Sequence, residues 1–243
     1  MKVFKYETHL HTFQSSACGQ TKGEDYIKPY FDAGYSGIFV TDHFFGGNTK
    51  ALRIGDWKTR IESYCFGYES AKKAADEFNQ KNNLFGTENE FKVFFGIEQT
   101  FDGDDYLVYG FDKIWLINHP EIEKMNHKEL FDAVNSVNGL MIQAHPFRFR
   151  NYMEAIHLHI REVHGVEIYN SGNKAEENLL AKIYASQYDF PTTSGSDIHN
   201  VEKLFSNDGL KIGGVYFDSP LNSVFDYANR IKEKKVNLIT DFI

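Results

Sequence analysis

The chain has 243 residues and is 42% apolar and 16% aromatic, which is enough to bury one substantial core, so we expect a single domain over residues 1–243. Its net charge of −8 and pI near 5.7 exclude a broad electrostatic attraction to nucleic acid or to an anionic membrane surface. The N-terminus lacks the apolar run of a signal peptide, and no stretch approaches the roughly 20 apolar residues that cross a bilayer. These features predict a cytoplasmic protein.

Strands and helices alternate along the chain. A strand is expected over residues 2–7, then a helix over 24–33 and a short apolar strand over 37–41. Apolar residues recur at steps of three and four from Trp57 to Phe78, which predicts one long helix with that face in the core. Further strands are expected at 92–96, 106–109, 140–143, 166–169 and 192–193, and further helices at 127–137, 152–163, 173–187 and 221–234.

This alternation is typical of a parallel sheet with crossover helices, either closed into a barrel or open and doubly wound. The sequence contains neither GxGxxG after the first strand nor GxxxxGK[ST], the usual motifs that cradle nucleotide phosphates. Instead, residues of the types that bind metals follow several strands. In a barrel the carboxyl ends of the strands meet at one mouth, where chemistry is expected.

The strongest functional signal is the set of histidines and carboxylates at these strand ends. His9 and His11 follow the first strand, where side chains two residues apart project to the same side and can bind one metal. His157 and His159 lie in a predicted helix, where the same spacing points them apart, so we do not expect them to be ligands. Later strand ends carry Asp42, His43, Glu98, His145, Asp197 and His199. Buried ionisable groups are costly unless paired or coordinated, so this set predicts a metal site.

Five short motifs carry a resemblance to a known family: HLHT at 9–12, TDH at 41–43, GIE at 96–98, AHPF at 144–147 and GSDIH at 195–199. In this order they resemble the motifs of the polymerase and histidinol phosphatase (PHP) domain family, over residues 9 to 199. The resemblance implies a distorted (β/α)7 TIM-like barrel with two or three divalent ions, zinc, iron or manganese. By position, His9, His11, Glu98 and Asp197 would surround one metal, and Glu98 would bridge to a second that His145 also holds. His43 and His199 would bind the third, and Glu98 and Asp197 would be the catalytic carboxylates.

The sequence departs from the family pattern at two places. Residues 12–18 contain no histidine or aspartate where the family often has one, and Ala17 and Cys18 stand there instead. The third metal would therefore be weak, absent, or completed by water or by Cys18. A family histidine after Glu98 is also missing, and we expect Asp105 to be the substitute ligand, which would shift the site toward manganese or iron(II). The competing interpretation of Asp105 is a solvated acidic turn.

The implied activity is a metal-dependent phosphoesterase that hydrolyses phosphate esters through a metal-bound hydroxide, because clustered divalent ions activate water and clamp the attacking and leaving oxygens. Arg148 is the expected phosphate-binding residue, with Arg150 and Lys22 as second choices. A phosphomonoesterase acting on a small phosphorylated metabolite leads over a phosphodiesterase or exonuclease on nucleotides, since the chain is acidic and has no nucleic-acid module. The sequence is also compatible with a non-catalytic metal-binding domain and with a metal-dependent amide hydrolase.

The remaining polar residues of interest receive weaker assignments. Asp42 and Asn170 are expected to orient ligands or to line the pocket. His119, His127 and His164 lack a partner at ligand spacing, so they are assigned no functional role.

Overall fold

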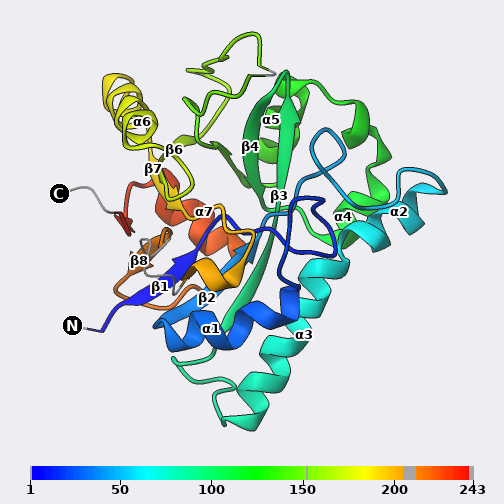
Figure 1. Ribbon diagram of the computed structural model, residues 1–243, viewed down its shortest axis with the longest axis vertical. Coiled ribbons are helices and arrows are strands. Elements are labelled where there is room, and N and C mark those ends of the chain that lie inside the picture. The colour runs from blue at the N-terminus through cyan, green and yellow to red at the C-terminus, as the bar shows by residue number, and fades with distance from the viewer. Residues whose placement is uncertain (1, 152, 205–211, 241–243) are drawn as a thin grey trace.

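One curved sheet organises the computed structural model, which describes residues 2–151, 153–204 and 212–240 (Figure 1). Its strands follow the order β7-β6-β5-β4-β3-β2-β1-β8-β9. A parallel bridge between Leu10 and Ile198 joins the chain beyond β1 to the chain beyond β7 and brings the sheet close to a closed barrel. The described strands are β1 (Phe4–Glu7), β2 (Tyr35–Val40), β3 (Lys92–Phe101), β4 (Asp104–Tyr109), β5 (Leu140–Gln143), β6 (Gly165–Asn170), β7 (Thr192–Gly195), β8 (Val215–Phe217) and β9 (Asn237–Leu238).

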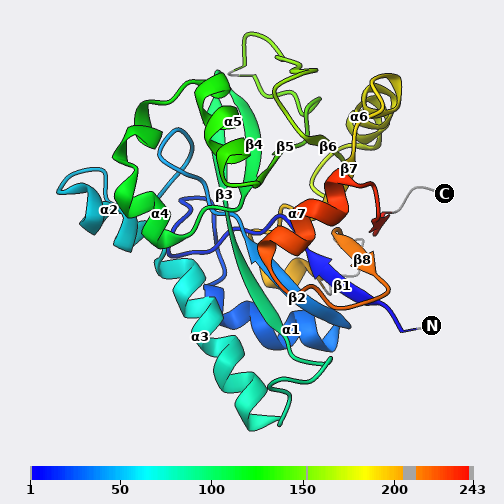
Figure 2. The same ribbon diagram turned by 180° about the vertical axis from the view of Figure 1, so that it is seen from behind.

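Helices pack around this sheet (Figure 2). They are α1 (Ile27–Asp32), α2 (Trp57–Tyr64), α3 (Phe66–Lys81), α4 (Lys113–Asn118), α5 (His127–Ser136), α6 (Ala175–Gln187) and α7 (Val224–Lys232), with 3-10 turns at Gly23–Tyr26, Pro120–Lys124 and Val201–Leu204. Of these, α7 covers the inner face of the sheet. None of these helices has the length and apolar character needed to cross a bilayer. The distorted barrel that the family resemblance implies is confirmed, and most predicted elements agree with the observed ones to within a few residues.

The alternation of side chains along β2 separates the two sides of the sheet. Ile38 and Val40 pack in the apolar cluster that contains α1 and α3 residues, whereas Phe39 points to the other side. There Phe39 packs on Tyr109 of β4 and Tyr227 of α7, with ring centroids 5.4 and 4.5 Å away. The barrel interior is therefore a packed aromatic core below the mouth.

The direction of β4 differs from the parallel arrangement that the alternation favours. β4 pairs antiparallel with both β3 and β5. Asp102 and Gly103 connect β3 to β4 with φ values of 51° and 91°, the positive values that a two-residue hairpin turn requires. Because β4 runs in reverse, its first residues lie at the end of the barrel where the parallel strands finish.

The predicted long helix is two helices, α2 and α3, separated at Cys65. The hydroxyl of Ser15 inserts at this point: its Oγ donates to the carbonyl oxygen of Tyr64 at 2.6 Å and accepts from the N–H of Gly67 at 3.2 Å. A side chain that enters the backbone ladder in this way interrupts a helix. The predicted apolar face is nevertheless in the core, with Ile61, Tyr64, Ala71 and Ala75 buried.

The helix predicted over residues 152–163 is wrong for residues 153–163, which form an irregular loop; residue 152 lies outside the described residues. Asp104 Oδ2 accepts from the backbone N–H of His157 at 2.9 Å and lies 2.8 Å from its Nδ1. Gln143 donates to the carbonyl oxygen of His157 at 2.6 Å. These hydrogen bonds to β4 and β5 engage the backbone N–H and carbonyl oxygen of His157, which in a helix would bond to other residues of that helix.

Candidate metal centre

All the ligands expected from the sequence lie at the mouth of the barrel. His9 and His11 follow β1, His43 follows β2, His145 follows β5, and Asp197 and His199 follow β7. Glu98 was expected after its strand but lies within β3, which is longer than predicted, and Asp105 lies at the start of the reversed β4. A cavity of about 410 Å³ opens above this set, lined by His43, Glu98, Asp105, His145, Arg148, Asp197 and His199 among others.

Glu98 is the centre of this arrangement. Its Oε1 lies 3.0 Å from His9 Nε2 and 3.4 Å from His145 Nε2. Its Oε2 lies 3.3 Å from His11 Nε2 and 2.8 Å from His43 Nδ1. Glu98 itself is 1% exposed. One carboxylate is therefore shared among imidazoles from three different strand ends.

The spacing of these atoms is the spacing of metal ligands. Asp197 Oδ1 completes the set at 3.1 Å from His11 Nε2 and 3.5 Å from His9 Nε2. With bonds of about 2.0–2.2 Å, neighbouring ligands of a tetrahedral zinc ion stand roughly 3.3–3.5 Å apart. His9 Nε2, His11 Nε2 and Glu98 Oε2 are also buried without a hydrogen-bond partner. Since buried polar atoms in folded proteins are almost always satisfied, these residues fit divalent cations shared through Glu98.

Electrostatics favours a neutral His11 beside ionised Glu98 and Asp197. Against the effect of burial, by contrast, the neighbouring carboxylates Asp197 and Glu98 raise the pKa of His9 and His43 well above the ordinary value. Burial and the neighbouring imidazole of His43 lower the pKa of His11 to about 3, so its ring is neutral. Burial alone would raise the pKa of Glu98, but His43, His9 and His11 hold it well below its usual range. The pKa of Asp197 is likewise held low against burial, mainly by Arg148 and His9. Neutral imidazoles and ionised carboxylates are the ligand forms.

Glu167 orients two of the candidate ligands, a role that the sequence analysis did not assign. Its Oε1 lies 3.1 Å from His9 Nδ1, and its Oε2 accepts from the backbone N–H of His145 at 3.1 Å. The amide of Asn170 donates to the same Oε2 at 2.9 Å. A carboxylate on Nδ1 fixes the ring so that Nε2 faces the metal. The available signal was a glutamate among the apolar residues Val166, Ile168 and Tyr169 of β6.

Ser16 and Asp42 hold His11 in the same way. Asp42 accepts from the Ser16 hydroxyl at 2.6 Å and from the backbone N–H of Thr12 at 2.7 Å. The Ser16 Oγ in turn lies 3.1 Å from His11 Nδ1 and accepts from the backbone N–H of His43 at 3.0 Å. The orienting role expected for Asp42 agrees with this geometry. Ser16 was missed because a single hydroxyl in a loop gives no sequence signal.

Glu7 ties the first and last motifs together. Its fully buried carboxylate accepts from the backbone N–H groups of Thr8, His9 and Ser196, each at 2.9 Å. The hydroxyls of Ser196 and Tyr30 also donate to it. His9 is one of these donors, and Asp197 directly follows another, Ser196. Glu7 therefore fixes the distance between the strand ends that carry His9 and Asp197.

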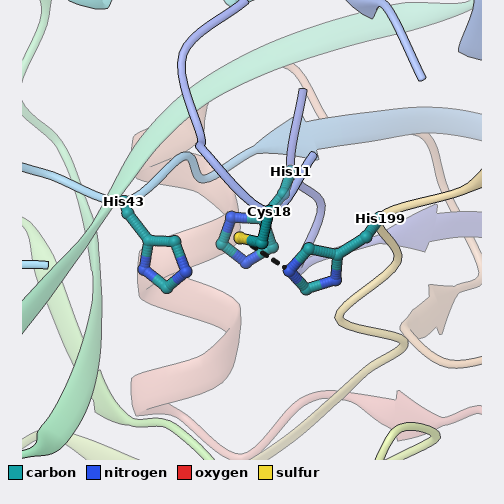
Figure 3. A group of neighbouring side chains, drawn as sticks. All are labelled: His11, Cys18, His43 and His199. Carbon is teal, nitrogen blue, oxygen red and sulfur yellow. Dashed lines mark hydrogen bonds between the residues drawn. The ribbon is translucent and has the colours of Figure 1, made fainter. Parts of the chain in front are cut away.

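A second group of side chains surrounds Cys18 (Figure 3). Cys18 Sγ lies 3.1 Å from His199 Nε2, and one atom each of His11, Cys18, His43 and His199 falls within 4.8 Å of the others. His11 stacks between His43 and His199, with ring centroids 4.5 Å away on each side. The thiol therefore lies beside His43 and His199, the two imidazoles expected at the third ion.

Asp105 points into the mouth, which rules out a solvated acidic turn. Its Oδ1 accepts from the Thr100 hydroxyl at 2.5 Å, and its Oδ2 lies 3.9 Å from His145 Nε2. One atom each of His43, Glu98 and Asp105 lies within 4.8 Å of the others. Its role as a ligand stays a prediction.

The three candidate phosphate-binding cations have different surroundings. Arg148 donates through Nε to Asn173 and through Nη2 to Asn170, each at 2.6 Å, and through Nη1 to Asp197 Oδ2. Arg150 lines the same cavity as Arg148. Lys22 is exposed and does not line that cavity.

Comparisons with known proteins agree on the fold. No family model matches the chain. It is 32% identical to an uncharacterized protein of Methanocaldococcus jannaschii over 120 residues, which cover 46% of this chain and only half, 50%, of that protein.

Three solved structures are similar over nearly the whole chain. A two-domain protein of Bacteroides vulgatus that contains a predicted PHP-like metal-dependent phosphoesterase has a TM-score of 0.69 and 13% identity, covering 98% of this chain and 65% of that one. A predicted metal-dependent phosphoesterase of Bifidobacterium adolescentis has a TM-score of 0.55 and 12% identity, covering 93% and 96%. An amidohydrolase of Chromobacterium violaceum with bound sulfate has a TM-score of 0.51 and 10% identity, covering 97% of each chain. These structures confirm the PHP-type barrel predicted from the motifs.

Binding of a divalent ion at the mouth should stabilise the fold. After removal of metals with a chelator, adding Mn²⁺ at 100 times its dissociation constant should raise the free energy of unfolding by about 2.7 kcal/mol per site, measured by urea denaturation. The His9→Ala/His11→Ala variant should lose this gain, whereas a His119→Gln control, whose ring stacks on Trp115, should keep it. Equal stabilisation of the double variant and the wild type would contradict the centre.

Proposed function

We propose that the chain is a metal-dependent phosphoesterase whose substrate is a small phosphate monoester. The most direct support is that one cavity contains both a candidate metal centre and a guanidinium group. A cluster of unsatisfied imidazole and carboxylate atoms lies at its base, and the guanidinium of Arg148 lies at its edge. The cluster suits divalent ions, and a guanidinium suits a phosphate group.

The roles of the residues follow from their contacts. Divalent ions at such a centre, when bound, lower the pKa of water and neutralise charge on phosphoryl oxygens. Glu98 and Asp197 are the carboxylates that would hold them, because each contacts more than one imidazole. Arg148 uses three of the five N–H groups of a guanidinium in the bonds described above, which leaves two for an anion. The fixed guanidinium therefore places a phosphate next to Asp197.

The size and charge of the site favour a small monoester over a nucleic acid. The cavity of about 410 Å³ has the volume of a site for one small molecule. A chain with a net charge of −8 has no excess of cations along which a polynucleotide would bind. An amide hydrolase would share the metal ligands, but the neutral amide group is a poorer partner than a phosphate for the partly buried guanidinium of Arg148. Retention of every ligand expected for the first metal, namely His9, His11, Glu98 and Asp197, argues against a non-catalytic domain.

The proposed activity is tested by phosphate release from a panel of phosphomonoesters, phosphodiesters and amides. Protein reloaded with Mn²⁺, Fe²⁺ or Zn²⁺ should hydrolyse monoesters fastest, and the His9→Ala/His11→Ala variant should retain less than about 1% of that rate, since loss of a metal that stabilises several kcal/mol of transition-state charge costs at least 100-fold. Turnover of amides alone would favour the amide hydrolase. Metal binding without turnover on any substrate would sink the enzymatic proposal.

Arg148 is expected to act on the phosphate itself. Arg148→Lys should lower kcat/KM for a monoester by roughly 10–100-fold, because hydrogen bonds to a charged group contribute about 1.5–3 kcal/mol and lysine cannot reproduce the planar fork. Arg150→Lys, in the same cavity, should change kcat/KM by less. If Arg148→Lys instead weakens metal binding at unchanged KM, the residue serves only to position Asp197.

We further propose that Cys18 completes a third metal site with His43 and His199. Its sulfur lies on the His199 side of the centre, next to the two imidazoles that the family pattern gives to the third ion. Thiolate and imidazole together favour zinc over harder ions. On this proposal, Cys18 replaces the histidine or aspartate that the family often has in residues 12–18.

The contribution of Cys18 can be measured as the number of zinc ions bound per chain. Cys18→Ala should bind one equivalent of zinc fewer than the wild type, whereas Cys18→His should restore it. Cys65→Ala is the matched control, because Cys65 is a buried thiol outside the mouth. Cobalt-loaded protein should show a sulfur-to-metal charge-transfer absorption that Cys18→Ala removes. Its presence in Cys18→Ala would contradict the assignment.

A further inference from the structure

A second cluster of potential metal ligands lies away from the mouth, at the N-terminus of α5. His127 begins that helix, and His159 and Glu162 come from the end of the loop between β5 and β6. Glu162 Oε2 lies 3.3 Å from His127 Nδ1 and 3.6 Å from His159 Nδ1. These separations are close to the roughly 3.3–3.5 Å between neighbouring ligands of a tetrahedral zinc ion. The three side chains therefore converge on one carboxylate oxygen, and a rotation of the stacked rings would direct both Nδ1 atoms to one ion.

The pairing of His127 within the protein is incomplete. The residue is only 9% exposed, and its Nε2 is buried without a hydrogen-bond partner. Its ring stacks on that of His159 with centroids 3.7 Å apart, and both rings turn Nδ1 toward the same carboxylate oxygen. Of these two contacts only that of His127 Nδ1 is within hydrogen-bond distance, so His159 Nδ1 has no hydrogen bond to the carboxylate. A cation between the three groups, by contrast, would be bound by both Nδ1 atoms and by Glu162. Burial and His159 lower the pKa of His127 to about 4, so its ring is neutral and able to bind metal.

This cluster is separate from the mouth because the sheet lies between them. Asp105 and Tyr106 are neighbours in β4, so their side chains point to opposite faces. Asp105 faces His145 and Glu98, while the ring of Tyr106 packs edge-on against that of His127 at 4.5 Å. No residue is shared between the cluster and the groups that line the mouth.

The loop that supplies His159 and Glu162 is long and requires contacts that fix its position. Residues 144–164 connect β5 to β6 where the alternating pattern expects a helix, and their described part, drawn in yellow-green in Figure 1, has no helix or strand. Connections of more than about 12–15 residues without secondary structure are uncommon in a folded domain. This loop also begins with His145 and carries Arg148, so its position matters to the mouth. Asp104 holds it at His157, and the cluster with His127 lies just beyond that point.

We propose that His127, His159 and Glu162 bind a divalent transition-metal ion, most readily zinc, at a site distinct from the centre at the mouth. Two imidazoles and one carboxylate are an established zinc ligand set, in which water fills the fourth position. The ion joins the end of the loop 144–164 to the N-terminus of α5. The inference does not depend on the proposed phosphoesterase activity.

The test is a zinc count on full-length variants. Chelator-treated protein is incubated with Zn²⁺, passed through a desalting column and analysed for bound zinc by mass spectrometry. His159→Gln and Glu162→Gln should each carry one equivalent fewer than the wild type, while the His9→Ala/His11→Ala variant should retain the equivalent bound at this cluster. His157→Gln is the matched control on the same loop and should bind as much zinc as the wild type. The zinc that His159→Gln and Glu162→Gln keep at the mouth shows that they are folded.

A second measurement follows the loop directly. Hydrogen exchange of the amides in residues 154–163 should slow on addition of Zn²⁺ to the His9→Ala/His11→Ala variant, and the slowing should disappear when Glu162→Gln is added. Equal zinc content in wild type, His159→Gln and Glu162→Gln overturns the proposal, as does absence of zinc from His9→Ala/His11→Ala. Loss of phosphoesterase activity on every substrate leaves both measurements interpretable, so the two proposals fail separately.

Discussion

The burial of Glu98 among imidazoles is the interaction on which the mouth of this barrel depends. A carboxylate that is 1% exposed, with four histidine nitrogens within 3.4 Å, requires compensation for its lost hydration. The imidazoles supply part of that compensation only when protonated, and divalent ions supply it when the rings are neutral. The spacing of the atoms and the unsatisfied nitrogens fit a centre built around cations, and burial with the neighbouring His43 lowers the pKa of His11 to about 3, which keeps that ring in its metal-binding form.

The surrounding structure keeps these ligands in place at some cost. His145 and Asp197 have φ values of 29° and 52°, in a region that residues other than glycine rarely adopt and that costs about 1–3 kcal/mol each. Glu167 holds the backbone of His145, and Glu7 holds the residue before Asp197. Buried carboxylates that accept several N–H groups thus support strained positions at the ends of β5 and β7.

Two departures from regular strand and helix alternation also place residues at the mouth. Because β4 runs antiparallel to its neighbours, its first residues lie at the mouth, where the parallel strands end. Asp105 is one of these residues. The loop 144–164 replaces a crossover helix, so that Arg148 reaches Asp197 while His159 reaches α5 on the other side of the sheet. The same loop therefore connects the candidate catalytic centre to the second candidate metal site.

The sequence by itself determined the alternation of strands and helices, and its motifs indicated the barrel and the residues that meet at its mouth. His9 and His11 share a side because strand side chains alternate, and residues at the ends of parallel strands meet in any such barrel. The tertiary structure alone decided the break at Cys65, the loop at 153–163 and the roles of Glu7, Ser16 and Glu167. Each of these depends on a partner distant in the chain, as when Ser15 interrupts a helix after Tyr64 or Glu7 binds Ser196. Local periodicity carries no information about such partners, because their hydrogen bonds exist only after the strand ends have come together.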